Sequence, residues 1–112
     1  PGYSGVSMGL LVGSQPDAFI VCHHANRTHI SGWDDFPLPS IEDVINLTTT
    51  VGAQVNPAIH CVGVSVNTSD LNDNERKDYL DALSARLNLP CVDPLKGGTN
   101  KIIERIIAEF SN

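Results

Sequence analysis

Two short, largely apolar runs constrain the fold of this chain more than any other feature. Residues 18–22 read AFIVC and residues 61–66 read CVGVSV, and turn-forming or polar residues follow both. Strands that are apolar on both faces are typical of a parallel sheet that helices cover on both sides. The two runs therefore predict an α/β fold.

Helical patterns surround these runs. A helix is predicted at residues 5–13, capped by Ser4. Its three glycines at four-residue spacing predict close packing against a neighbouring element or, alternatively, close approach of a ligand to the backbone. Further helices begin after Ser40 and Asn72, each with an acidic residue three positions later, and after the KGGT sequence at residues 96–99. With a short strand at residues 89–92, this order predicts a three-layer α/β/α fold with a parallel sheet.

Length and charge limit the classes of function. A chain of 112 residues, 41% of them hydrophobic, suits a single α/β domain over residues 1–112, or a fragment of one. The net charge of −6 and the lack of a basic run argue against a nucleic-acid partner. No apolar stretch approaches the ~20 residues that cross a bilayer, so no membrane association is expected.

The three cysteines, Cys22, Cys61 and Cys91, each touch an apolar run. An odd number of widely spaced cysteines in such positions predicts buried free thiols, and hence a cytoplasmic protein. A long stretch without periodicity, residues 25–39, holds the only tryptophan, Trp33. Because long loops in compact domains are often functional, this loop supports an alternative hypothesis, a non-catalytic α/β module that binds a small ligand or a protein.

Polar residues follow all three predicted strands. They are His23, His24, Asn26 and Arg27 after the first, Asn67, Thr68 and Ser69 after the second, and Asp93, Lys96, Gly97 and Gly98 after the third. The carboxyl ends of parallel strands share one edge of the sheet, where such folds bind ligands. The sequence therefore predicts a small-molecule site at this edge.

Each of these residues has a functional and an ordinary interpretation. The amide of Asn67 suits recognition of a purine edge, or it caps the next turn. Arg27 suits a phosphate or carboxylate group, or it is a solvated loop residue. The loop at Lys96 suits an anion or is a plain turn, and it is not a Walker A sequence.

A metal site is not predicted from this segment. Cys22, His23, His24 and His29 are the residues with suitable side chains, but neighbouring strand residues point to opposite faces of a sheet. No more than two of them would readily meet. Spacing also identifies no third group to orient a cysteine–histidine nucleophile pair, so no residue is assigned a catalytic role.

Five blocks in order, PGYSGVSMGLLVGSQPDA, CHHANRTHI, PLPSIEDVI, CVGVSVNTSDL and LPCVDPLKGG, resemble the carboxyl-terminal part of a bacterial and archaeal family of unknown function. That family includes D-glutamate N-acetyltransferases. The resemblance implies the last three strands of a domain similar to P-loop NTPases, with its phosphate loop in a missing amino-terminal part of the same protein. A glycine is expected just before Arg27, where this chain has Asn26.

The resemblance also implies a function. It predicts an enzyme fragment that binds acetyl-CoA or ATP and belongs to an acetyl transfer from acetyl-CoA to a D-amino acid. Asn67 would contact the base, Thr68 and Ser69 would lie beside it, and Arg27 and the Lys96–Gly97–Gly98 loop would meet phosphate or carboxylate. His23, His24 and Arg27 would lie on the substrate side. Exposed sheet edges and the glycine face of the first helix predict a homo-oligomer.

Overall fold

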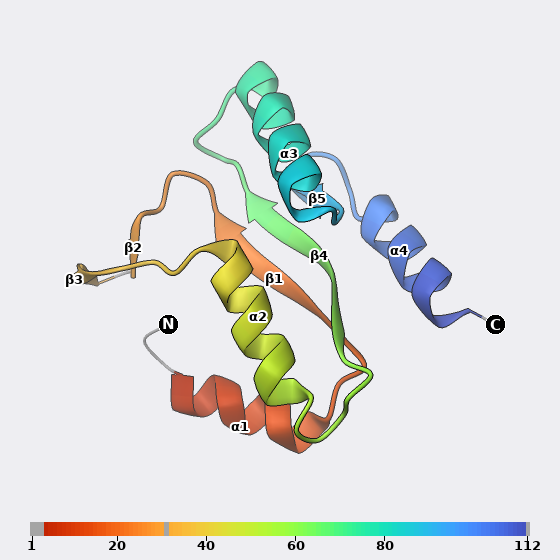
Figure 1. Ribbon diagram of the computed structural model, residues 1–112. Coiled ribbons are helices and arrows are strands. Elements are labelled where there is room, and N and C mark those ends of the chain that lie inside the picture. Colours follow the sequence, from red (N-terminus) through yellow and green to blue (C-terminus); the bar gives the residue numbers. More distant parts are fainter. Residues whose placement is uncertain (1–3, 31, 112) are drawn as a thin grey trace. The chain divides into compact units, whose positions relative to one another are not determined.

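The computed structural model describes residues 4–30 and 32–111. Their elements are, in order, α1 (Ser4–Ser14), β1 (Ala18–His24), β2 (His29–Ile30), β3 (Trp33–Pro37), α2 (Ile41–Gly52), β4 (His60–Asn67), α3 (Asp73–Leu87), β5 (Cys91–Val92) and α4 (Asn100–Phe110) (Figure 1). They divide into two compact units. Unit 1 comprises Pro1–Phe19 and Arg27–Cys61, and unit 2 comprises Ile20–Asn26 and Val62–Asn112.

The main sheet has three strands in the order β1-β4-β5. β4 and β5 pair in parallel, with Val64 opposite Cys91, and the arrows of β1 and β4 run in the same direction in Figure 1. Just past the end of β1, the Ala25 N–H donates to the Asn67 carbonyl at 3.0 Å. The predicted α/β fold, a parallel sheet with flanking helices, is therefore confirmed.

The core of unit 2 lies along β4. Val62, Val64, Val66 and Thr68 are at most 1% exposed and occupy alternate positions, so they lie on one face of the strand. Gly63 lies on the other face, where an added Cβ would be 2.8 Å from Cγ1 of Ile102. The close approach of α4 to the sheet therefore depends on the absence of a side chain at Gly63.

The helix starts match the capping patterns of the sequence. The side chain of Ser40 accepts from the Asp43 N–H at 3.0 Å, and Asn72 and Glu75 form a reciprocal capping box at 3.0 and 2.9 Å. α3 ends at Leu87, where Asn88 adopts a left-handed φ of 53°. α2 ends at Gly52, which lies so close to Ile59 that an added Cβ would clash at 2.5 Å.

Three predictions are corrected by the structure. The predicted loop at residues 25–39 contains an antiparallel hairpin, β2–β3, in which His29 faces Pro37. A Cβ added at any of the three glycines of α1 would meet no atom within 4 Å, so their predicted close packing is wrong within the described residues. Cys22 is exposed, whereas Cys61 and Cys91 are buried as predicted.

Ser4 is predicted from the sequence to cap the first helix, from a position just before it. The helix includes Ser4, whose side chain lies outside the described part of the molecule. Among the described helices, none has both the length and the apolar character to cross a membrane.

Candidate functional site

The candidate site is built at the carboxyl end of β4, in unit 2. Asn67 is exposed, and its side-chain oxygen accepts from the Ser69 N–H at 3.0 Å. This is the turn-forming role that the sequence left open for Asn67. The side-chain NH2 of Asn67 donates to none of the described residues. The amide therefore closes a turn and still presents two donors to solvent.

Thr68 is fully buried, although it follows the strand in a run of polar residues. Its N–H and its hydroxyl both donate to one carboxylate oxygen of Asp93, at 3.0 and 2.5 Å. The hydroxyl also accepts from Nε of Arg76 at 3.1 Å. Thr68 thus continues the inward-facing positions of β4 and joins the ends of two strands.

Asp93 organises the loop after β5 as well as the end of β4. Its second carboxylate oxygen accepts from the Leu95 N–H at 3.0 Å. Its backbone carbonyl accepts from the N–H groups of Lys96 and Gly97, at 3.1 and 2.9 Å. Gly98 follows with a φ of 78°, a conformation that favours glycine. The position of the Lys96–Gly97–Gly98 loop is therefore set by Asp93.

Asp93 is ionised because its hydrogen bonds outweigh the effect of burial. Burial by itself raises the pKa of the Asp93 carboxyl, but the bonds from the Thr68 hydroxyl, the Thr68 N–H and the Leu95 N–H, together with the positive charge of Arg76, hold that pKa below its usual value. A buried carboxylate with donors on both oxygens is a rigid anchor at this edge.

Arg76 belongs to the polar side of α3, yet its side chain is only 18% exposed. It bonds Thr68 and the Asp73 carboxylate, the latter at 2.9 Å. Arg76 was not predicted as a site residue, and Asp93 was placed at this sheet edge without a role. The available signals were the aspartate directly after the apolar CV pair of β5 and the alternation from Val62 to Thr68.

A cavity of about 480 Å³ adjoins this network within unit 2. The cavity is lined by residues of α3, of β5, of the loop that follows β5, and of the first turn of α4. These residues are Arg76, Lys77, Leu80, Asp81, Ser84, Cys91, Val92, Asp93, Lys96, Gly97, Gly98, Asn100 and Lys101. Three predicted site residues, Lys96, Gly97 and Gly98, therefore lie on one cavity. Asn67, Thr68 and Ser69 do not line it, and the Thr68–Asp93 bonds connect the two groups.

The histidines at the end of β1 are half-buried. Nδ1 of His24 lies 2.5 Å from the Ala25 carbonyl oxygen, and its Nε2 lies 3.7 Å from an Asp70 carboxylate oxygen. The turn after β1 contains Asn26 with a left-handed φ of 69°. Asparagine adopts this conformation more readily than most residues, which explains how it stands where the family resemblance implies a glycine.

Arg27 is exposed and belongs to unit 1, whereas the other predicted site residues belong to unit 2. His29, one of the residues considered as metal ligands, forms a hydrogen bond with the preceding residue. Its Nδ1 lies 2.7 Å from the Thr28 hydroxyl oxygen. Within residues 4–30 and 32–111, no group of three or more histidine, cysteine or acidic side chains could hold a metal ion.

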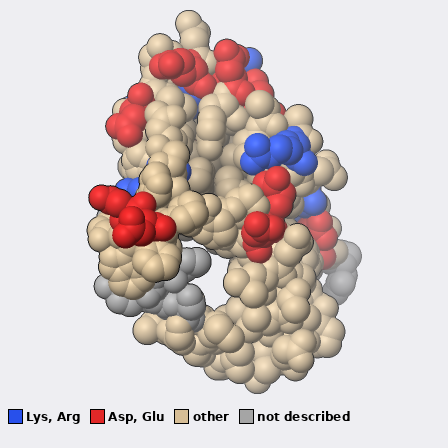
Figure 2. Space-filling model, turned by 60° about the vertical axis from the view of Figure 1, so that its left-hand side comes forward, with Lys and Arg blue, Asp and Glu red and all other residues tan. Residues whose placement is uncertain are grey.

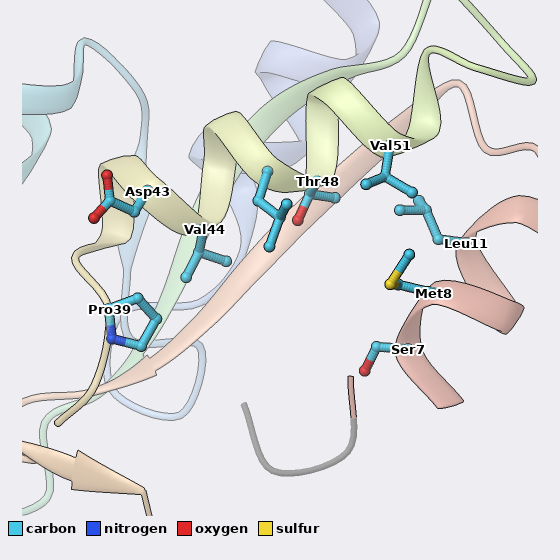
Figure 3. A pocket seen from close by; sticks show the side chains of 9 residues that line it. Ser7, Met8, Leu11, Pro39, Asp43, Val44, Thr48 and Val51 are labelled. Atoms are coloured by element: carbon cyan, nitrogen blue, oxygen red, sulfur yellow. The ribbon is translucent and has the colours of Figure 1, made fainter. Parts of the chain in front are cut away.

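Unit 1 has a cavity of its own, of about 550 Å³, which the sequence did not predict as a site. Figure 3 shows Met8 and Leu11 of α1 facing Val44 and Val51 of α2 across it. Ser7, Pro39, Asp43, Leu47 and Thr48 complete the lining. The lining is mainly apolar, in contrast to the charged cavity of unit 2.

Known proteins resemble this chain over nearly its whole length. D-glutamate N-acetyltransferases from Pseudoalteromonas sp. and Tritonibacter scottomollicae are 42% and 39% identical to it over 106 residues, which is 95% of this chain and 32% of each relative. The chain therefore spans about a third of the length of these curated relatives.

A solved structure also matches this chain. The crystal structure of a DUF1611 family protein from Anabaena variabilis matches with a TM-score of 0.84 and 27% identity, over 91% of this chain and 30% of that one. The model of the P-loop domain of unknown function DUF1611_C matches residues 1–103. The chain therefore belongs to the DUF1611 family, and the match falls within its carboxyl-terminal P-loop domain.

Proposed function

We propose that this chain is part of an enzyme that transfers an acetyl group from acetyl-CoA to the amino group of a D-amino acid such as D-glutamate. The observation that carries the proposal is the Thr68–Asp93 pair, which fixes the end of β4 and the loop after β5 at one sheet edge. The names of the two curated relatives, matched over 95% of this chain, support the reaction type.

In this proposal, the sheet edge holds the nucleotide part of the cofactor. The two N–H donors of Asn67 point to solvent and suit acceptor atoms of an adenine, which both acetyl-CoA and ATP contain. Thr68 and Ser69 hold the turn that positions Asn67, and Lys96, Gly97 and Gly98 lie on the cavity beside it. A phosphate or pyrophosphate group is the part of the cofactor that suits that loop.

The acceptor amino acid brings a carboxylate and an amine. His23 and His24 at the end of β1 and Arg27 in the following segment are the residues proposed for this side of the site. The chemistry requires the neutral amine to attack the thioester carbonyl, the C–S bond to break, and the amine proton to leave with the CoA thiolate. Arg27 suits the acceptor carboxylate because a guanidinium binds carboxylates through two parallel hydrogen bonds.

The test uses the protein at its full natural length. Release of free CoA thiol from acetyl-CoA is followed with D-glutamate and, as a control, with L-glutamate. We expect turnover with the D-isomer, and we expect Asn67→Ala to raise the KM for acetyl-CoA about tenfold, the effect of losing one or two hydrogen bonds. The absence of thiol release with either isomer would contradict the proposed reaction, and an unchanged KM would remove Asn67 from the cofactor site.

A further inference from the structure

The lysines of this chain gather around one cavity. The sequence contains three lysines, Lys77, Lys96 and Lys101, and all three line the cavity of about 480 Å³ in unit 2. They come from three different segments, α3, the loop after β5, and the first turn of α4. Arg76 contributes a fourth cation to the same lining. A single solvated helix face does not account for this arrangement, because the lysines converge from separate elements.

Two of the four cations have no compensating charge. Arg76 pairs with Asp73, and Lys77 pairs with Asp81 at 3.2 Å. Within the described residues, the side chains of Lys96 and Lys101 make no ion pair or hydrogen bond. The acidic residues of the lining are Asp81, which Lys77 neutralises, and Asp93, whose carboxylate is buried and bonded to Thr68 and Leu95. The cavity therefore keeps two uncompensated ammonium groups.

The rest of the chain is acidic. Its net charge is −6, and the face in Figure 2 carries acidic side chains in several separate groups. A negatively charged surface repels anions. The cavity differs because all three lysines of the chain line it and add positive charge there. Asn100, the first residue of α4, also lines the cavity, and the N-cap residue Thr99 makes no side-chain cap there. The helix dipole adds positive potential to that of the lysines.

We propose that this cavity binds a phosphate-bearing ligand through Lys77, Lys96 and Lys101, with a pyrophosphate-like group between the lysines. The inference extends the proposed function, since acetyl-CoA and ATP both carry such a group. Binding of inorganic pyrophosphate by the cavity does not require acetyl transfer. The competing explanation is that the lysines only protect the edge strand β5 from pairing with another chain.

The test is isothermal titration of the full-length protein with inorganic pyrophosphate at low and high salt. Lys96→Gln and Lys101→Gln are compared with Arg105→Gln, which removes the same charge from α4 at a position outside the cavity, where Arg105 pairs with Glu109. We expect binding that weakens with salt, a loss of roughly fivefold for each lysine variant and more than tenfold for the double variant, and little change for Arg105→Gln. Circular dichroism of each variant checks that it folds.

Each outcome decides the proposal. Binding that depends on the lysines supports it, and displacement of pyrophosphate by acetyl-CoA or ATP then identifies the source of the phosphate. Lysine-dependent binding that neither nucleotide displaces also supports it and points to another phosphate compound. If the protein does not bind pyrophosphate, or if Arg105→Gln weakens binding as much as the lysine variants, the proposal is wrong. Pyrophosphate binding without acetyl transfer would leave this inference in place and remove the proposed reaction.

Discussion

At the scale of single residues, Asp93 has the largest structural consequence in the site. Its carboxylate accepts from Thr68 and Leu95, and it is 5% exposed. In Asp93→Asn, the side-chain NH2 replaces an oxygen that accepts hydrogen bonds, so a donor then faces a donor. We expect a loss of about 2–4 kcal/mol in the free energy of unfolding. Urea denaturation measures it. Asp78→Asn, on the exposed side of α3, is the control and is expected to change stability by less than about 0.5 kcal/mol.

The same residue predicts a dependence on pH. The pKa of Asp93 is lower in the folded chain than its ordinary value of about 3.9, so the folded state binds this proton more weakly than the unfolded state. The stabilisation is therefore complete above about pH 4 and is lost as the pH falls through the folded-state pKa. Unfolding free energies measured from pH 7 to pH 3 should show the gap between wild type and Asp93→Asn narrowing below about pH 4. A gap of constant size would contradict the ionised carboxylate.

At the scale of elements, the contact between β4 and α4 depends on Gly63. An added Cβ would lie 2.8 Å from Ile102 and 3.0 Å from the Pro90 carbonyl oxygen. We expect Gly63→Ala to destabilise the protein by about 1–3 kcal/mol, measured by urea denaturation, because α4 and the β5 backbone must shift. Gly9→Ala is the matched control, since a Cβ there meets nothing and alanine favours the helix. Equal stability of Gly63→Ala and wild type would mean that α4 does not pack against this position.

The elements also show what could be read from the sequence. The apolar runs predicted β1 and β4, and the capping pattern of Asn72 and Glu75 predicted the start of α3, because these signals are local. β3 was missed because all its residues are exposed, so backbone pairing forms it without an apolar pattern. The burial of Thr68 was missed for another reason. It depends on Asp93, which lies 25 positions away, and no spacing rule connects them.

At the scale of the whole molecule, both terminal helices expose apolar side chains. In α1, Val6 and Leu10 are 65% and 70% exposed, and in α4, Ile103 and Ile107 are 47% and 56% exposed. α1 has no charged residue, and α4 carries an apolar face beside a charged one. Exposed apolar faces of this kind favour contact with further protein. The chain spans about a third of the length of its curated relatives.

When the 112-residue chain is produced alone, we expect it to associate as its concentration rises, and to bind a dye that reports exposed apolar surface. Val6→Gln with Leu10→Gln should reduce both effects, because these side chains contribute the most exposed apolar surface of α1. Leu95→Gln is the control, a 93% exposed leucine in a loop. Light scattering after size-exclusion chromatography measures the association. A wild-type chain that stays monomeric and binds no dye would contradict this prediction.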